Sequence, residues 1–403
     1  MDFHTEKWNY INEGNVHIVL QITNTDYVLR LVKEEEKPVN LQITQNAVQF
    51  VNLVMVPLIC DIGLYQEEII EISSKSLVYL SAELAKVRPE HRQIKSTLSK
   101  FAIKAPNLTL ISQNSVNYCL EIKPKEGFRS ASFNSLPKCY YCLKQFLKLQ
   151  DKQINAVSNY CPLDLFSGDR KRMKTALLSL LNNPQNNFKM FKNGEMIYNE
   201  KSNILKLDNI VNTMNMFSST NLFLDFVIDI LLSKGQKETI LSESEAPLVK
   251  SKSIECIENS KLERNTFLYK LLKLQKLSEN LTLDIENIKD SGLSYVSTIL
   301  EELKSKELQL GREIDWKEFL ENTKPLHLAL ISAVAKDCSI MISFTVESID
   351  GFPYIKVGGN KISYRILLTD LEPKPVTTLI KRKNTEKKLI ELYQKCIVSS
   401  ESP

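Results

Sequence analysis

Two aspartates near the C-terminus stand at the ends of predicted strands. Asp337 directly precedes the apolar run 338–346, and Asp370 ends the run 362–370. Two carboxylates at adjoining strand ends could share a magnesium ion that bridges the phosphates of ATP, or one could bind the metal while the other orients a hydroxyl. Each aspartate read alone is more typical of a helix cap or a turn.

Two lysines in EIKPK (121–125) suit the same chemistry. Pro124 stiffens the backbone between Lys123 and Lys125, and residues at i and i+2 of an extended strand project to one face. Like charges on one face are unfavourable unless an anion neutralises them, so a phosphate ligand explains the pair, with Glu121 as an orienting partner. A solvated lysine pair at a strand end explains it equally well.

Three further segments could contact phosphate. Gly14, within Glu-Gly-Asn, would let backbone N–H groups approach closely, although an ordinary hairpin turn is favoured there. The loop PQNNFK (184–189) offers two amides and Lys189, which are also typical of a helix end. Lys374 follows Asp370 by four residues and adds a cation beside the same predicted site.

The elements that must position these residues follow from hydrophobic periodicity. Alternating patterns predict a hairpin over 16–22 and 27–33, further strands at 108–112 and 118–123, and antiparallel strands at 338–346, 354–357 and 362–370. Apolar residues three and four apart predict helices around 41–56, 77–87, 267–277, 295–308 and 377–396, and a mostly helical stretch over 138–234.

This order predicts two lobes. A small mixed lobe covers 1–114, and a larger lobe covers 115–403. Residues 236–263 are rich in Ser, Glu and Lys and predict an exposed, mobile insertion.

Composition limits the partners. The chain has 403 residues and 43% apolar content, which is ample for two cores, and its 52 basic and 48 acidic residues leave a net charge of +4. We therefore expect no nucleic-acid or membrane partner, and any anion site must be local. The polar start MDFHTEKWNY lacks the order of a signal peptide, so an intracellular protein with reduced cysteines is expected. The Cys139–Cys142 pair has no second Cys-x-x-Cys.

Taken together, these segments resemble the inositol-pentakisphosphate 2-kinase family, in the same order and over nearly the whole chain. The residues that carry the resemblance are EGN (13–15), VLRL (28–31), RPEHR (88–92), EIKPK (121–125), YCPLDLFSG (160–168), PQNNFK (184–189), AKDCSIM (335–341) and DLEPKP (370–375).

The resemblance implies an α+β, two-lobed fold related to protein kinases, with a larger, helix-rich second lobe. It implies transfer of phosphate from ATP, with Mg²⁺, to the 2-hydroxyl of inositol 1,3,4,5,6-pentakisphosphate, which gives inositol hexakisphosphate (phytate). A monomer in the cytoplasm or nucleus is expected.

The resemblance also implies roles for single residues. Asp337 would orient the attacking hydroxyl, Asp370 would hold magnesium with Asp337 as a second ligand, and Lys123 would act beside them in catalysis. The residues expected to contact the nucleotide are Gly14, Asn15, Arg30, Gln113, Asn114, Glu121, Lys123 and Lys189. Those expected to bind inositol phosphates are Arg88, Lys125, Lys148, Asn186 and Lys374.

The chain departs from the family pattern in the acceptor region. Tyr140 and Lys144 stand where the family often carries arginine and histidine. Thr378 stands where the family has an arginine after DLEPKP, and Lys381 or Arg382 could substitute for it.

A zinc ion is held in some members by a Cys/His cluster in the second lobe. Residues 236–326 of this chain contain Cys256 alone and no histidine, so we expect no structural zinc.

Other functions fit less well. A protein kinase would need the H-R-D, D-F-G and A-P-E motifs, which the sequence lacks. A silent inositol-phosphate-binding scaffold would gain nothing from retaining Asp337 and Asp370 near phosphates. A nucleic-acid binder would need basic residues interleaved with aromatics, and the basic stretch 381–388 is more typical of a solvated helix face.

Overall fold

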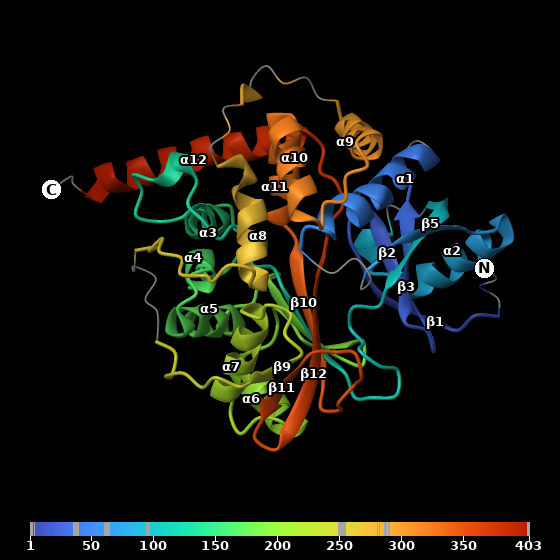
Figure 1. Ribbon diagram of the computed structural model, residues 1–403, viewed down its shortest axis with the longest axis horizontal. Coiled ribbons are helices and arrows are strands. Elements are labelled where there is room, and N and C mark those ends of the chain that lie inside the picture. Colours follow the sequence, from blue (N-terminus) through green and yellow to red (C-terminus); the bar gives the residue numbers. More distant parts are fainter. Residues whose placement is uncertain are drawn as a thin grey trace. The chain divides into compact units, whose positions relative to one another are not determined.

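The computed structural model describes residues 3, 5–34, 40–59, 65–93, 97–248, 255–279, 281, 283–285, 288 and 291–400. The chain divides into two compact units, the first comprising Met1–Ser115 and Leu293–Asn322, the second Val116–Gly292 and Thr323–Pro403 (Figure 1). The α+β class is confirmed. Residues 293–322, which the sequence analysis assigned to the second lobe, group with the first unit.

The first unit is built on an antiparallel sheet of strand order β1-β2-β3-β5-β4 within the described residues. Its strands are β1 (Trp8–Glu13), β2 (His17–Ile22), β3 (Tyr27–Lys33), β4 (Glu68–Glu71) and β5 (Leu98–Pro106). The predicted hairpin is β2–β3 and is confirmed. The strand predicted at 108–112 is wrong: the strand lies earlier, as β5, and Asn107 then starts a turn in which its side chain accepts hydrogen bonds from the N–H and Oγ1 of Thr109.

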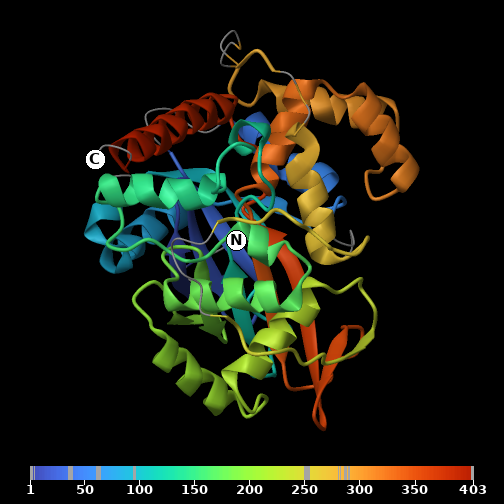
Figure 2. The same ribbon diagram turned by 90° about the vertical axis from the view of Figure 1, so that its left-hand side faces the viewer.

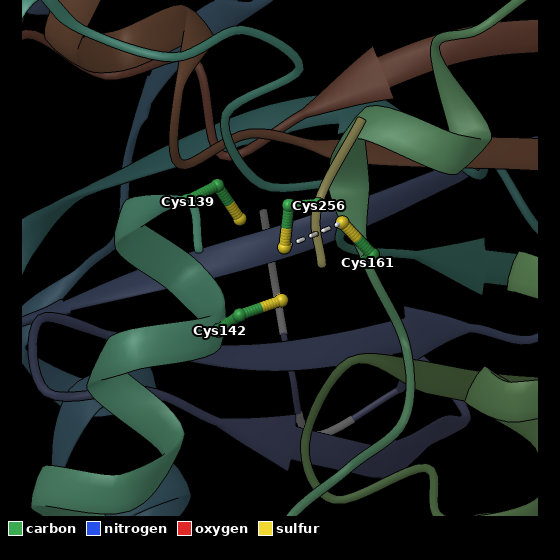
Figure 3. A group of neighbouring side chains, drawn as sticks. All are labelled: Cys139, Cys142, Cys161 and Cys256. Atoms are coloured by element: carbon green, nitrogen blue, oxygen red, sulfur yellow. Dashed lines mark hydrogen bonds between the residues drawn. The ribbon is translucent and has the colours of Figure 1, made fainter. Parts of the chain in front are cut away.

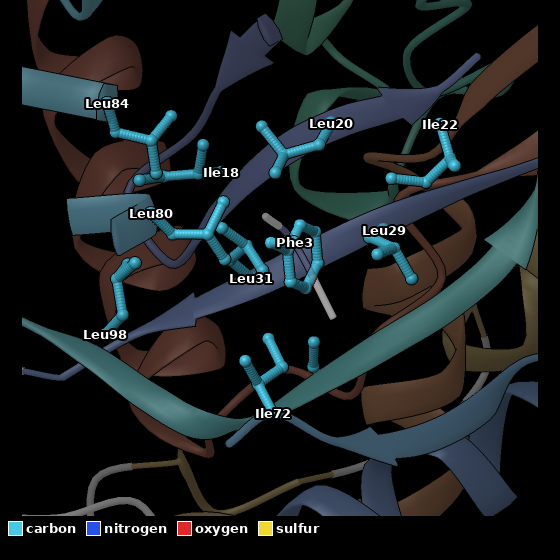
Figure 4. Close-up of a cluster of buried hydrophobic side chains, with 11 residues drawn as sticks. Phe3, Ile18, Leu20, Ile22, Leu29, Leu31, Ile72, Leu80, Leu84 and Leu98 are labelled. Atoms are coloured by element: carbon cyan, nitrogen blue, oxygen red, sulfur yellow. The ribbon is translucent and has the colours of Figure 1, made fainter. Parts of the chain in front are cut away.

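The core of this unit lies where the inner face of the sheet meets a helix. Alternate residues of β2, Ile18, Leu20 and Ile22, are fully buried, as strand geometry requires for a half-buried sheet (Figure 4). Leu80 and Leu84, one turn apart, extend the same cluster from α2. The helices of this unit are α1 (Leu41–Phe50), which continues as a π-helical turn η1 (Val51–Met55), α2 (Ser74–Val87), the 3₁₀ turn η3 (Glu90–Arg92), α9 (Ser294–Ser305) and α10 (Glu313–Asn322).

The second unit is built on a sheet of order β8-β7-β6-β10-β12-β11-β9 within the described residues. Its strands are β6 (Tyr118–Ile122), β7 (Phe188–Lys192), β8 (Glu195–Tyr198), β9 (Glu238–Ile240), β10 (Ser339–Thr345), β11 (Tyr354–Val357) and β12 (Asn360–Thr369). Every residue of the central β10 is buried. The three strands predicted near the C-terminus are confirmed as antiparallel, with β12 between β10 and β11. The β7–β8 hairpin interrupts the stretch that was predicted to be mostly helical.

Helices accompany this sheet (Figure 2). They are α3 (Tyr140–Gln150), α4 (Pro162–Leu165), α5 (Arg170–Asn182), α6 (Ile204–Met214), α7 (Thr220–Leu231), α8 (Phe267–Gln275), α11 (Pro325–Ala335) and α12 (Thr377–Ser400), with 3₁₀ turns η4 (Ala131–Phe133) and η5 (Lys276–Ser278). Phe344 of β10 packs against Phe223 and Phe226 of α7. Among the described residues, no helix has both the length and the apolar run needed to cross a bilayer.

The segment 236–263, expected to be a mobile insertion, is anchored along its described residues. β9 pairs in parallel with β11. The backbone N–H and Oγ of Ser244 donate to the buried carboxylate of Asp225, and the N–H of Lys261 donates to the carbonyl of Ser167. Residues 249–254 lie outside the described part of the chain.

A buried ion pair on α5 and α7 gives the first testable prediction. Lys174 and Asp225 are both fully buried, with 2.8 Å between Lys174 Nζ and Asp225 Oδ2. Lys174→Met removes the nearer cation of the buried Asp225 carboxylate and leaves Arg170 Nη2 at 3.8 Å, a guanidinium that Asp229 also binds. We therefore expect the free energy of unfolding to fall by about 3 kcal/mol in urea denaturation.

The control is Lys171→Met on the same helix. Lys171 pairs with Glu245 at the surface, where both side chains are more than 40% exposed, so its loss should leave the free energy of unfolding nearly unchanged. Equal losses for the two variants would contradict the prediction.

Candidate active site

Strand ends of the second unit meet at one edge of the seven-stranded sheet. Ser339 at the start of β10 pairs with Thr369 at the end of β12, and the next residue of β10 pairs with Ile122 at the end of β6. Lys123 and Asp370, which follow β6 and β12 directly, therefore lie side by side. Their ion pair spans 2.9 Å from Lys123 Nζ to Asp370 Oδ2.

Each carboxylate along this edge is paired with a lysine, and Ser339 lies between the two carboxylates. Ser339 donates from Oγ to Asp370 (3.0 Å) and to Glu121 (3.3 Å), and Lys189 Nζ lies 3.2 Å from Glu121 Oε2. Burial opposes the charge of Lys123, but Asp370 and Glu121 outweigh it, so the pKa of Lys123 lies above its ordinary value. Sequence reasoning missed Ser339, although it stands two residues after Asp337 at the start of a predicted strand.

Asp337 lies between two lysines, both predicted to be site residues. Its carboxylate accepts hydrogen bonds from Lys125 Nζ (3.4 Å) and Lys374 Nζ (3.1 Å). Burial favours the neutral acid, but these two ammonium groups outweigh it and hold the pKa of Asp337 below its ordinary value. The side chain is 57% exposed, so an ionised carboxylate is open to an incoming ligand.

Two of these residues have a left-handed backbone. Lys125 has φ +61° and Asp370 has φ +63°. For non-glycine residues this region costs of order 1–3 kcal/mol and persists only where the surrounding structure enforces it. The strain therefore falls on two residues that the sequence analysis assigned to the site.

A third group of cations comes from α3. Lys144 and Lys148 are four residues apart and so lie on one helix face. Burial lowers the pKa of both, and the pKa of Lys148 is lowered further by Lys144 and by Lys125. The three ammonium groups are therefore close enough to repel one another, which makes this a favourable place for an anion. Lys144 departs from the family pattern and was not among the residues predicted to bind inositol phosphates.

The loop 184–189 presents one exposed and one buried amide. Asn186, expected to contact inositol phosphates, is exposed in a turn that the N–H of Asn187 closes by donating to the carbonyl of Pro184. The buried Asn187 donates from Nδ2 to the hydroxyl of Tyr141 (3.1 Å). Of the two asparagines, the structure therefore leaves Asn186 available to a ligand.

Arg382, considered as a substitute for the family arginine, is engaged by protein groups. Its guanidinium contacts Glu126 (2.6 Å) and Glu386 (2.6 Å), and lies 3.3 Å from the centre of the Tyr140 ring. These contacts fix α12 to α3 and to the segment after Lys125.

In the first unit, Arg88 is held by a carboxylate. Arg88 Nε and Nη2 each donate to Glu13 at 2.9 Å, and Lys33 pairs with the same carboxylate. Burial would raise the pKa of Glu13, but Arg88 and Lys33 outweigh it and lower that pKa. Lys33 also donates to the carbonyl of Gly14 (2.8 Å). Arg88, expected to grip inositol phosphates, is therefore bound to the strand that leads into the Gly14 loop.

Four further residues predicted to contact the nucleotide lie in this unit. Arg30 donates to Glu67 (2.8 Å) and Asn15 accepts from Arg92 (3.2 Å). Gln113 and Asn114 are exposed in a turn.

Four cysteine sulfurs point toward one another in the second unit (Figure 3). They belong to Cys139, Cys142, Cys161 and Cys256, and all lie within 4.8 Å of one another. The 3.6 Å between the sulfurs of Cys161 and Cys256 is too long for a disulfide. The four residues come from the first turn of α3, the start of α4 and the anchored segment 255–263.

This cluster fits a zinc ion. Four thiolates are a standard structural zinc set, and a tetrahedron with Zn–S bonds of about 2.3 Å places the sulfurs about 3.8 Å apart. The expectation of no structural zinc rested on the isolation of Cys256 in the sequence, and that reason is wrong because three distant cysteines converge on Cys256. The Cys-x-x-Cys of Cys139 and Cys142 was the signal for this site.

The family model for inositol-pentakisphosphate 2-kinase matches residues 10–388. The chain belongs to this family. An inositol-pentakisphosphate 2-kinase of Danio rerio is 28% identical over 451 aligned residues, which cover 96% of this chain and 92% of the relative. A protein of the same name from Arabidopsis thaliana is 29% identical and covers 68% of this chain and 59% of its own length. The chain is thus a kinase, a phosphate-transferring enzyme that acts on inositol phosphates.

The geometry around Asp337 gives a prediction about its titration. In Lys374→Met, one of the two ammonium groups beside Asp337 is lost, so the pKa of Asp337 should rise toward its ordinary value. A ¹³C NMR titration of the carboxylates measures this shift. The control is Lys356→Met, which removes a lysine paired with Glu238 on β9 and should leave the pKa of Asp337 unchanged. An unchanged pKa of Asp337 in Lys374→Met would contradict the claim that the Lys374 ammonium lowers it.

Proposed function

We propose that this kinase transfers the γ-phosphate of ATP to the 2-hydroxyl of inositol 1,3,4,5,6-pentakisphosphate and releases inositol hexakisphosphate and ADP. The observation that carries the proposal is the exposed Asp337 carboxylate between Lys125 and Lys374, in a chain whose family model is that of the pentakisphosphate kinases.

The acceptor chemistry fits the lysines of the second unit. A ring with five phosphates presents anions on most sides, so it needs cations from several segments. Lys125 comes from the segment after β6, Lys144 and Lys148 from α3, and Lys374 from the segment after β12. With Asn186 they would bind the phosphates. Arg88 is a weaker candidate because Glu13 already neutralises it.

Asp337 would orient the attacking hydroxyl. Its lowered pKa keeps it ionised at neutral pH, so it can accept a hydrogen bond from the 2-hydroxyl. The hydroxyl oxygen forms a bond to the γ-phosphorus while the bond from that phosphorus to the β,γ-bridging oxygen breaks, and the hydroxyl proton passes to Asp337 and then to solvent. A loose transition state needs little proton transfer early on, so a weakly basic carboxylate suffices.

Asp370 is suited to magnesium because Mg²⁺ prefers carboxylate oxygens. Its side chain is 43% exposed, and Lys123 beside it can neutralise a phosphate. Asp370, with Asp337 as the second candidate ligand, would hold the ion, which would neutralise charge on the phosphates of ATP.

The first unit would supply further contacts to ATP. Gly14, Asn15 and Arg30 would approach its phosphates, while Gln113 and Asn114 would meet its base. Glu121 and Lys189 are likewise proposed as nucleotide contacts. A two-lobed fold related to protein kinases is also part of the proposal.

The proposal predicts that Asp337→Asn lowers kcat for pentakisphosphate phosphorylation by about 10²–10⁴-fold, because the amide cannot take up the hydroxyl proton. The purified protein is assayed with ATP and Mg²⁺ over a panel of inositol phosphates, with product separation by anion-exchange chromatography. Circular dichroism checks that the variant is folded.

Asp350→Asn is the matched control. Asp350 is exposed in the loop between β10 and β11, and its substitution should leave turnover unchanged. If the parent protein binds pentakisphosphate by calorimetry but forms no ATP-dependent product, it is an inositol-phosphate-binding scaffold and the proposed function fails.

We further propose that the cluster of Cys139, Cys142, Cys161 and Cys256 holds a structural zinc ion. Such an ion would fix the first turn of α3 to the segment 255–263. Because Lys144 and Lys148 lie on the following turns of α3, the zinc would also support the acceptor lysines.

This site predicts about one equivalent of zinc per chain by inductively coupled plasma mass spectrometry after purification without chelators. Cys256→Ser should lose most of the metal, whereas Cys119→Ala, at a buried cysteine of β6 outside the cluster, should keep it. A strong chelator should lower the melting temperature of the parent protein more than that of Cys256→Ser. A metal-free parent protein, with a melting temperature that the chelator does not change, would contradict the proposal.

A further inference from the structure

One buried amide joins the two segments that carry Lys125 and Asp337. Gln275, the last residue of α8, is fully buried. Its Nε2 donates to the carbonyl oxygens of Lys125 (2.9 Å) and Ala335 (3.1 Å), and its Oε1 accepts from the N–H of Gly127 (2.8 Å). Each of the two N–H groups of the amide therefore donates to a backbone carbonyl of one of these segments.

The chemistry of the partners admits only this orientation of the amide. The two carbonyl oxygens can only accept hydrogen bonds, and the N–H of Gly127 can only donate one. A glutamine side chain supplies two donors and an acceptor at this length. Methionine matches its length but supplies none of the three bonds.

The segment that Gln275 holds has little freedom to relax. Lys125 has φ +61°, which its surroundings must enforce. A Cβ atom at Gly127 would lie 2.3 Å from the Phe166 ring, so the backbone there packs directly against that ring. A change at the carbonyl of Lys125 would therefore alter the direction of its side chain instead of being absorbed locally.

A second buried link connects the neighbours of the same two residues. Glu126, which follows Lys125, pairs with Lys336 at 3.1 Å, and Lys336 directly precedes Asp337. The Glu126 side chain is only 4% exposed. The two segments are thus linked once through backbone groups and once through an ion pair.

We propose that Gln275 is a positioning residue of this kinase, because its amide fixes the place of the Lys125 ammonium relative to the Asp337 carboxylate by bonding to both segments. The inference rests on the proposed function, in which Lys125 binds an acceptor phosphate and Asp337 orients the acceptor hydroxyl. Gln275 acts only through these two residues.

The test is Gln275→Met, which keeps the length of the side chain and removes the three hydrogen bonds. We expect kcat to fall by about 10–100-fold, as misplacement of reacting groups by about 1 Å costs this much. The KM for pentakisphosphate should rise at least about threefold, while the KM for ATP changes less than about twofold. A purely structural role would reduce the fraction of active enzyme and leave the KM values unchanged.

Ser332→Ala is the matched control. Ser332 Oγ donates to the backbone carbonyl of Gln275 (2.6 Å) and lies 3.0 Å from Ser278 Oγ. The variant therefore loses both of these hydrogen bonds, one of them to Gln275 itself, and keeps the side-chain amide of Gln275. It should lower the melting temperature and preserve kcat and both KM values. The proposal is overturned if folded Gln275→Met has parental constants, or if Ser332→Ala changes them equally.

Two further measurements keep the outcome decisive. If Gln275→Met does not fold, Gln275→Asn is measured in its place, because it keeps the amide on a side chain one methylene shorter. A fall in kcat with a rise in KM for pentakisphosphate then supports the proposal, and parental constants overturn it. If the parent protein phosphorylates no inositol phosphate, the proposed function fails. Calorimetry with inositol hexakisphosphate then tests whether Gln275 positions Lys125. Weaker binding by Gln275→Met than by Ser332→Ala would support positioning of Lys125, and equal binding would overturn it.

Discussion

The antiparallel pairing of β10 with β6 and β12 is the constraint on which the candidate site depends. The pairing brings the end of β6, the start of β10 and the end of β12 to one edge of the sheet. A shift of one residue in either pairing would turn the side chains to the opposite face. The complete burial of β10 makes such a shift costly, because its apolar residues would lose their partners.

At that edge, electrostatics decides which groups are charged. Lysines pair with Asp337, Asp370 and Glu121, and Lys125 and Lys374 hold the pKa of Asp337 below its ordinary value against the effect of burial. On α3, burial lowers the pKa of both Lys144 and Lys148, and the charge of Lys144 lowers the pKa of Lys148 further. A chain with nearly balanced charges can in this way contain a local site for a polyanion without a basic surface.

Links between distant segments hold this edge in place. Arg382 fixes α12 to the segment after Lys125, Gln275 joins that segment to α11, and the four cysteines bring together α3, α4 and residues 255–263. Each link uses a buried polar or thiol group that is expensive to leave without partners. In the second unit, hydrogen bonds, ion pairs and the cysteine cluster therefore hold the segments of the site in place, in addition to apolar packing.

The sequence by itself determined the elements and the residue types of the site. Alternation and helical periodicity predicted the β2–β3 hairpin, β6, α3 and the strands β10 to β12. An element that buries one face has apolar residues at the period of that element, so the pattern can be read locally. The segments EIKPK, AKDCSIM and DLEPKP contain the lysines and aspartates that were predicted to form the site.

Only the tertiary structure decided which partner each residue takes. Arg88 binds Glu13, which is 75 positions away in the sequence. Cys256 lies beside Cys161, 95 positions away, and Gln275 donates to the carbonyl of Lys125, 150 positions away. No local pattern encodes such distances, because they follow from strand register and helix packing that involve the whole unit.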